Sequence, residues 1–324
     1  MSTLDKIPVM LYGFGFIGRM LARALLKLKQ YDIVGVIDIN PKIVGHDIGD
    51  ILGTGKTGVI VSNNPEKVIR NSKPRVILHA TTSFLNQVFP QIKTAIEHGA
   101  NIISSCETLA YPWYRYPELA KELDKLAKKH EVTVLSAGVN PGFIFDTLPL
   151  IISGSCLFVK RIKVIRKINA LKRRLSFQRK IGLGIPAYMF DKLLNEGKIT
   201  GHVGYAESAM IIAKTLGFKL SKIVEKQEPI IFNNKVIGIK GYAAGYSGKR
   251  KRIYLEFIAS ANLKDQDIVV LECENYKIRW VSGGTPGDQA TISVMLSFIP
   301  TILKSESGLK TVADFIPFRT PVYS

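Results

Sequence analysis

The sequence has few of the features that mark secreted, membrane-spanning or metal-binding proteins. Its 324 residues include only 3 cysteines. The odd number and the lack of metal-ligand spacing predict neither a disulfide framework nor a metal site. No apolar run reaches the roughly 20 residues of a membrane span. The start, Met1 to Lys6, is polar and leads into a strand, so no signal peptide is expected. We therefore expect a soluble protein in a reducing, cytoplasmic setting.

Acidic residues are also scarce, and their distribution is uneven. The chain has 45 Lys and Arg against 26 Asp and Glu, a net charge of +19. The stretch from Lys160 to Lys180 contains no acid. Over its first residues, to Ile168, charges alternate with Val and Ile, which favours the solvent face of a strand. Contact with an anionic substrate or cofactor is the second interpretation. Nucleic acid is the least favoured partner, because no nucleic-acid-binding motif accompanies the charge.

A glycine-rich turn near the start indicates a dinucleotide site. The apolar run Ile7–Tyr12 is followed at once by Gly13-Phe14-Gly15-Phe16-Ile17-Gly18 and then by an amphipathic helical pattern. Between a strand and a helix, the first glycine permits a tight turn, the second lets the backbone approach a pyrophosphate, and the third allows close packing. The helix N-terminus then attracts the phosphates. A glycine turn without a ligand is the alternative.

Asp38 bears on which cofactor binds. It ends a second apolar run, 20 residues after Gly18, a spacing typical of the carboxylate that binds the adenosine ribose. An acid here favours NAD over NADP, because a 2′-phosphate would meet like charge. Lys42 could offset this in part, so both cofactors stay open. Alternatively, Asp38 only begins the turn 38–41.

The order of strand and helix patterns predicts an α/β protein with two domains. Alternation to residue 135 indicates a Rossmann-type parallel sheet with helices on both faces. Ligands bind beyond the carboxyl ends of such strands, where Ala80, Thr81 and Thr82 are expected to contact the cofactor, whereas His79 is expected to pack. The strand patterns 160–168, 253–261, 268–273 and 276–281, with a helix over 203–216, predict a second α+β domain on a mixed or antiparallel sheet. We place the dinucleotide-binding domain at 1–142 and the substrate and dimerisation domain at 143–324. We expect that a helix at about 285–305 could pack back on the first domain.

Several strings at the strand tips and near the end of the chain are more specific than the glycine turn. They are Glu-Thr-Leu-Ala-Tyr-Pro at 107–112, Gly-Val-Asn-Pro-Gly-Phe at 138–143, Gly-His-Val-Gly-Tyr at 201–205 and Thr-Pro-Gly-Asp-Gln-Ala-Thr at 285–291. In these strings the chain resembles 2,4-diaminopentanoate dehydrogenases and related native amine dehydrogenases. The resemblance covers most of the chain and is weakest over 219–267. More distantly, the chain is similar to dihydrodipicolinate reductases, whose paired-histidine catalytic string is absent here.

The resemblance implies reversible oxidative deamination of a primary amine with NAD or NADP. The family substrate, 2,4-diaminopentanoate, becomes 2-amino-4-oxopentanoate and ammonia, and related families suggest a homodimer formed through the sheet domain. Glu107 matches the glutamate that the family uses in catalysis. A partly desolvated carboxylate can take a proton from the substrate ammonium and later from water. The alternative is an ordinary acid at a helix N-terminus.

Further residues are candidates for binding. His202 could orient the substrate or bind its carboxylate, or be a capping or core histidine. Asn140 could hold the nicotinamide carboxamide or the substrate, or only shape a turn. Arg173 or Arg174 could meet a substrate carboxylate.

Four rival functions stay open. A nucleophilic Cys106 would need a base nearby, and the string typical of aldehyde-oxidising dehydrogenases is absent. A dihydrodipicolinate reductase-like imine reductase would lack its paired histidines. A non-catalytic NAD-binding regulator would not need Glu107, and a basic scaffold would use residues 160–180.

Overall fold

The computed structural model describes residues 6–317 and divides the chain into two compact units. Unit 1 is formed by the residues up to Val139 together with Gly287–Phe315. Unit 2 is formed by Asn140–Pro286 together with Ile316 and Pro317. Among the described residues, no helix is both long and apolar enough to cross a bilayer.

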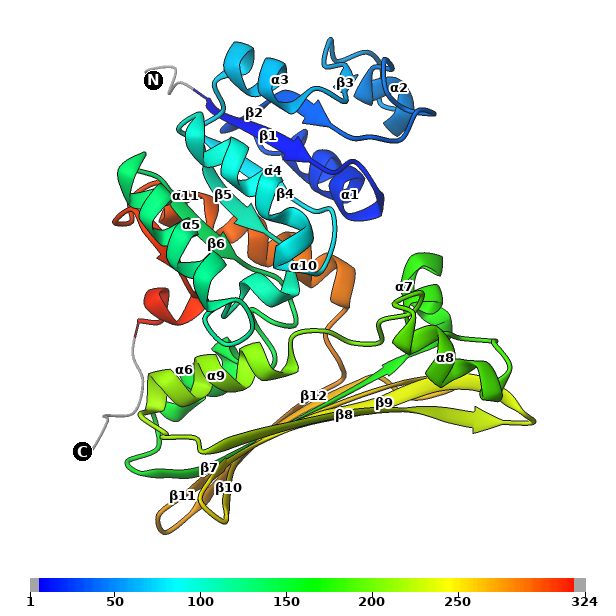
Figure 1. Cartoon of the computed structure of the whole chain (residues 1–324), viewed down its shortest axis with the longest axis vertical. Coiled ribbons are helices and arrows are strands. Elements are labelled where there is room, and N and C mark those ends of the chain that lie inside the picture. Colours follow the sequence, from blue (N-terminus) through cyan, green and yellow to red (C-terminus); the bar gives the residue numbers. More distant parts are fainter. Residues whose placement is uncertain (1–5, 318–324) are drawn as a thin grey trace. The chain divides into compact units, whose positions relative to one another are not determined.

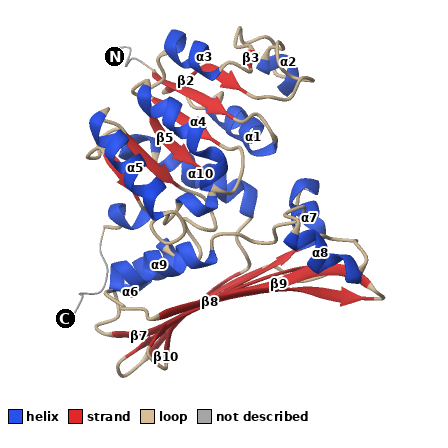
Figure 2. Cartoon of the chain, viewed as in Figure 1, coloured by secondary structure: helices blue, strands red, loops and turns tan. Residues whose placement is uncertain are grey.

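Unit 1 is a parallel seven-stranded sheet with helices on both faces (Figures 1 and 2). The strand order is β13-β6-β5-β4-β1-β2-β3. The strands are β1 (Ile7–Tyr12), β2 (Tyr31–Ile37), β3 (Val61–Ser62), β4 (Val76–His79), β5 (Asn101–Ser104), β6 (Thr133–Ser136) and β13 (Gly308–Lys310). The helices are α1 (Phe16–Leu25), α2 (Ile48–Leu52), α3 (Pro65–Ser72), α4 (Leu85–Glu97), α5 (Pro117–Lys129), α10 (Gly287–Ser297) and α11 (Ile299–Ile302), with short helices η1 (Glu107–Leu109) and η4 (Val312–Phe315).

The central strands explain why this sheet is parallel and covered on both faces. Every residue of β4 is buried, as are Ile102, Ile103 and Ser104 of β5. A strand that is apolar on both sides must be covered on both sides, which crossover helices achieve. The Rossmann-type sheet predicted from the sequence is confirmed.

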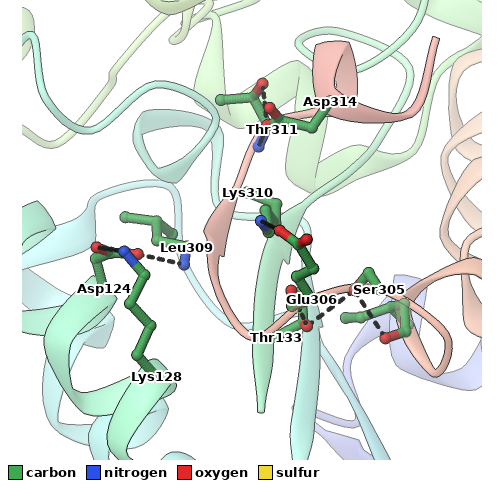
Figure 3. A network of polar contacts seen from close by, with 10 residues as sticks. Asp124, Lys128, Thr133, Ser305, Glu306, Leu309, Lys310, Thr311 and Asp314 are labelled. Atoms are coloured by element: carbon green, nitrogen blue, oxygen red, sulfur yellow. Dashed lines mark hydrogen bonds and ion pairs between the residues drawn. The ribbon is translucent and has the colours of Figure 1, made fainter. Parts of the chain in front are cut away.

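The C-terminal segment is bonded to the body of unit 1 (Figure 3). The backbone N–H of Leu309 in β13 donates to Asp124 Oδ1 at 3.0 Å, and Lys128 pairs with the other oxygen of Asp124 at 2.7 Å. The hydroxyls of Thr133 and Ser305 lie 2.9 Å apart. These contacts place β13 beside β6, at the edge of the sheet.

Unit 2 is a mixed six-stranded sheet of order β12-β11-β7-β10-β9-β8. Among the described strands, β7 and β10 are the only neighbours that pair in parallel, and the other neighbouring strands are antiparallel. Helices α6 and α9 pack on one face. The strands are β7 (Val159–Asn169), β8 (Lys222–Phe232), β9 (Lys235–Ser247), β10 (Arg250–Ser260), β11 (Gln266–Cys273) and β12 (Lys277–Ser282). The helices are α6 (Thr147–Ser153), α7 (Leu175–Lys180), α8 (Phe190–Asn195) and α9 (Tyr205–Leu216), with short helices η2 (Ala170–Lys172) and η3 (Ala187–Met189).

The structure corrects the prediction about cysteines. Cys156, after α6, and Cys273, at the end of β11, form a disulfide across a sequence separation of 117 residues. The odd count was misleading because one cysteine, Cys106, stays unpaired and buried. The expected reducing, cytoplasmic setting loses this support and stays a prediction.

The structure also corrects the solvent-face prediction at Arg166. Strict alternation in β7 places Ile162, Val164 and Arg166 on the buried face, and leaves Ile165 on the other face with the lysines. Arg166 is 1% exposed and pairs with Asp267, its neighbour in register on β11, at 3.4 Å. Its Nη2 donates to the carbonyl of Thr285 at 2.7 Å. The partner acid lies about a hundred residues away, so a local pattern could not reveal it.

Candidate active site

The carboxyl ends of β1, β4 and β5 lie along one edge of the unit 1 sheet, because these strands are parallel neighbours. The loops that follow them carry the glycine turn, residues 80–83 and Glu107. Open parallel sheets bind their ligands at such an edge. The residues of unit 1 that the sequence singled out therefore share one edge.

Two of the three glycines in the turn have environments that suit only glycine. Gly13 has a φ of +96°, and a Cβ there would collide with the carbonyl oxygen of Ala80. A Cβ on Gly18 would collide with the carbonyl oxygen of Gly13, so α1 approaches the turn closely. No described heavy atom lies within 4 Å of a Cβ built on Gly15, at the start of α1. The three environments fit the three roles of glycine in a dinucleotide turn.

Asp38 joins the glycine turn to the turn after β2. One carboxylate oxygen accepts the N–H of Phe14 at 2.6 Å, and the other accepts the N–H of Asn40 at 2.8 Å. Both interpretations of Asp38 therefore fit the structure, since the acid lies at the glycine turn and also begins the turn 38–41. The ring of Phe14 is buried, Ile17 is half-buried and Phe16 is 51% exposed.

The loop after β4 is held from two sides. The N–H of Ala80 donates to the last carbonyl of β1 at 2.8 Å. Thr81 and Thr82 are exposed, and their hydroxyls donate to Gln91 Oε1 at 2.9 Å and Gln87 Oε1 at 2.6 Å, both on α4. The exposed loop is thereby fixed against a helix.

Glu107 is the first residue of η1, just beyond β5, and is partly buried. The next residue, Thr108, bonds this segment to the loop after β4. Its N–H donates to the carbonyl of Ser83 at 3.1 Å, and its hydroxyl accepts the N–H of Leu85 at 2.8 Å. The backbone that carries Glu107 is thus fixed to the loop that carries the two threonines.

Cys106 is unsuited to nucleophilic chemistry. Burial raises the pKa of its thiol to about 12, and the charge of Glu107 adds to the effect. A thiol that stays protonated is a poor nucleophile. This weighs against the thioester alternative.

Asn140 and His202 meet within unit 2. Asn140 Nδ2 lies 3.4 Å from His202 Nε2. The imidazole is buried and stacks on Phe257, with ring centroids 4.6 Å apart. Burial lowers the pKa of His202 well below its usual value, and the cations of Lys180 and Arg166 lower it further. His202 is therefore a neutral ring beside positive charge, which also fits its interpretation as a core histidine.

One amide atom of Asn140 lacks a partner. Its Oδ1 is buried and has no hydrogen bond within the part of the chain that the structure describes. The loop around it is held by Asp146, which accepts the N–H of Gly142 at 3.0 Å and the hydroxyl of Ser208 at 2.6 Å. A buried acceptor without a donor is costly. A ligand with an ammonium or amide N–H would satisfy it.

The two halves of the chain match known families. The dihydrodipicolinate reductase N-terminus matches residues 7–137, and the 2,4-diaminopentanoate dehydrogenase C-terminal domain matches residues 143–322. A 2,4-diaminopentanoate dehydrogenase of Acetoanaerobium sticklandii is 32% identical over 332 residues, covering 96% of this chain and 94% of the relative. The chain belongs to the 2,4-diaminopentanoate dehydrogenase family. As a member of this family it is an oxidoreductase, and the resemblance stated from its motifs is confirmed.

Other similarities are weaker in sequence. An amine dehydrogenase of Streptomyces virginiae is 25% identical, covering 68% of this chain and 62% of the relative. The solved amine dehydrogenase of Mycobacterium smegmatis superposes with a TM-score of 0.85 at 22% identity, covering 99% of this chain and 98% of that one. A dihydrodipicolinate reductase of Paenisporosarcina superposes with a TM-score of 0.58 at 15% identity, covering 95% and 99%. At these identities the solved structures establish the fold alone.

Proposed function

We propose that this 2,4-diaminopentanoate dehydrogenase family member catalyses the reversible oxidative deamination of a primary amine with NAD or NADP. The proposed substrate is 2,4-diaminopentanoate, which becomes 2-amino-4-oxopentanoate and ammonia. The observation that carries the proposal is the position of Glu107 at the sheet edge that also carries the glycine turn. The family membership and the relative that spans almost the whole chain support it.

The residues at this edge suit a nicotinamide dinucleotide. The open space at Gly15 and the N-terminus of α1 would hold the pyrophosphate, and Asp38 would hold the adenosine ribose. When bound, the cofactor supplies the hydride acceptor. Asp38 already accepts two backbone N–H groups, and each of its oxygens keeps a lone pair for a ribose hydroxyl. Its negative charge would repel a 2′-phosphate, so we propose a preference for NAD.

Glu107 is proposed as the general base. The amine arrives as an ammonium, and Glu107 takes one proton so that the carbon can release a hydride. Water then adds to the resulting iminium carbon while a base accepts its proton, and the adduct collapses to a ketone and ammonia. One carboxylate can serve both steps if it passes the first proton to solvent before it accepts the second.

Unit 2 is proposed to recognise the amino-acid part of the substrate. Asn140 Oδ1 offers an unsatisfied acceptor for an ammonium. His202 is a neutral ring close to the cations of Arg166 and Lys180. Arg173 adds positive potential near Arg166, and the carboxylates of Asp267 and Asp265 offset part of it. Positive charge at this place suits a carboxylate, so Arg173 is proposed as its partner.

The open face of the unit 2 sheet is proposed as the surface of a homodimer. Helices α6 and α9 pack on the other face, and no helix of the described residues covers this one (Figure 1). Half-buried apolar side chains lie on it among the lysines, and neighbouring strands β7, β10 and β11 contribute Ile165, Ile258, Ile268 and Val270. An apolar sheet face of this kind is usually covered in the assembled protein.

The decisive test follows absorbance at 340 nm, the NADH band, with NAD or NADP and a panel of amines with and without a carboxylate. We expect NADH formation with 2,4-diaminopentanoate, faster with NAD, and weaker with amines that lack the carboxylate. Glu107→Gln should reduce kcat about a hundredfold or more, while NADH affinity measured by fluorescence is retained.

Two results would reject parts of this proposal. Near-native turnover by the Glu107→Gln variant would show that Glu107 is not the general base. Cofactor binding without turnover of any amine favours a non-catalytic NAD-binding regulator or an imine reductase.

A further inference from the structure

His79 ends β4 inside unit 1, and the proposed mechanism gives it no part. Its ring is 1% exposed, and both nitrogens have polar neighbours. Nδ1 lies 2.8 Å from Ser104 Oγ, and Nε2 lies 2.7 Å from Gln91 Oε1. Burial lowers the pKa of His79 to about 4, although the bond with Gln91 opposes the effect. At neutral pH the ring therefore carries a single proton.

The neighbours decide which nitrogen holds that proton. An amide oxygen carries no hydrogen, so the contact between Gln91 Oε1 and Nε2 requires the proton on Nε2. Nδ1 is then an acceptor, and the hydroxyl of Ser104 donates to it. Ser104 Oγ in turn accepts the N–H of Cys106 at 3.1 Å. One hydrogen-bonded chain thus connects the residue before Glu107 with the side chain of Gln91.

The same chain reaches Thr81, in the exposed loop after β4. The hydroxyl of Thr81 donates its only proton to Gln91 Oε1 at 2.9 Å, and its oxygen lies 3.0 Å from His79 Nε2. Because that proton is committed, any further bond of this hydroxyl to a ligand must be one in which it accepts. The polarity of this exposed hydroxyl is therefore set by Gln91, whose amide oxygen is bonded to the buried imidazole.

We propose that His79 is a positioning residue that, through Gln91, fixes the Thr81 hydroxyl as an acceptor for a hydrogen-bond donor of the bound nicotinamide cofactor. The proposal rests on the proposed function only in that such a cofactor binds at this sheet edge. It requires no amine turnover. The proposal explains why His79, a polar residue, is buried in β4, whose other residues are apolar.

A double-mutant cycle on the NADH dissociation constant, followed by NADH fluorescence without amine, tests the proposal. Thr81→Val removes the acceptor and should weaken NADH binding about three- to tenfold, the range for one hydrogen bond. His79→Gln should weaken binding by a similar factor alone and by no further factor in the Thr81→Val background. A double variant whose loss equals the product of the two single losses would show that His79 only packs. No effect of Thr81→Val would also overturn the proposal.

Two further variants complete the design. If His79→Gln fails to fold, Gln91→Met replaces it, because Gln91 is half-buried on α4 and its loss breaks the same connection. Gln91→Met should weaken NADH binding alone and should add no further loss in the Thr81→Val background. Thr82→Val is the matched control, because Thr82 bonds to Gln87 and not to this chain. The factor by which Thr82→Val changes the NADH dissociation constant should be the same with and without His79→Gln. If the enzyme oxidises amines but the losses of NADH affinity at His79 and Thr81 multiply, this inference alone is rejected. If the two losses are not independent but no amine is oxidised, the proposed reaction alone is rejected.

Discussion

Asp47 shows at the scale of one residue how hydrogen bonds hold a loop. Burial would raise its pKa, but donors from Thr57, Gly49 and Gly58 outweigh burial and lower it from 3.8 to about 2. The folded protein thus binds this proton less readily than the unfolded chain does. Asp47 therefore stabilises the fold above about pH 4, and the contribution is lost as the pH falls toward about 2.

The predicted consequence is a change in the acid dependence of stability. Asp47→Asn should lower the free energy of unfolding near neutral pH and flatten its decline between about pH 4 and 2, because the substituted side chain has no proton to gain. Urea denaturation at a series of pH values measures both effects. If the free energy of unfolding of the variant declined between about pH 4 and 2 as steeply as that of the wild type, the role given to Asp47 would be contradicted.

Residue-scale prediction from the sequence reaches furthest where a residue's neighbours are close along the chain. The structure places Asp38 at the glycine turn, as a spacing set by one strand and one helix implies, while the cofactor roles of both stay predictions. Arg166 was misassigned because its partner, Asp267, comes from a different strand of the sheet. The acceptor role of Thr81 was also invisible, since it depends on Gln91 from α4 and His79 from β4. A local sequence pattern carries no information about such contacts between distant segments.

At the scale of elements, boundaries were predicted well where a stop signal is local. Helix α9 ends at Gly217, which has a φ of +72° and the left-handed conformation that glycine favours. Helix α4 begins at Leu85 and contains Pro90, a residue that more often marks a helix start or break. The proline leaves one main-chain hydrogen bond unmade, but the residues before it, including Leu85 and Val88, pack in the core. Tertiary packing therefore sets this boundary against the local signal.

The disulfide is the connection between elements that the sequence did not predict, and it carries a test. Cys156 and Cys273 close a loop of more than a hundred residues, for which the chain-entropy account gives stabilisation of up to about 5 kcal/mol. Cys156→Ala with Cys273→Ala should therefore lower the urea midpoint, and a reductant should lower the wild-type midpoint to match. Cys106→Ala, which removes the unpaired cysteine, is the control and should keep the response to reductant. A wild-type midpoint that reductant leaves unchanged would contradict a stabilising bridge.

At the scale of the whole molecule, the excess positive charge has a consequence for assembly. The net charge of +19 opposes association of two copies, so a dimer must gain enough from apolar contact to outweigh that repulsion. Salt screens the repulsion and leaves apolar contact intact. Raising the ionic strength should therefore strengthen the proposed dimer, whereas an association held by ion pairs would weaken.

Ile268→Glu tests which surface forms that dimer. Ile268 lies half-buried on the open face of the unit 2 sheet, on β11, which lies between β12 and β7. A carboxylate there would have to be desolvated at the interface in both copies, even beside the lysines of β7, at a cost of several kcal/mol, so the variant should be a monomer in sedimentation velocity. Ile60→Glu, an exposed apolar site in unit 1, is the matched control and should sediment like wild type. A wild-type monomer, or a dimer that survives Ile268→Glu, would move the interface elsewhere or abolish it. The half-buried isoleucines of this sheet would then have to be explained by the fold of a single chain.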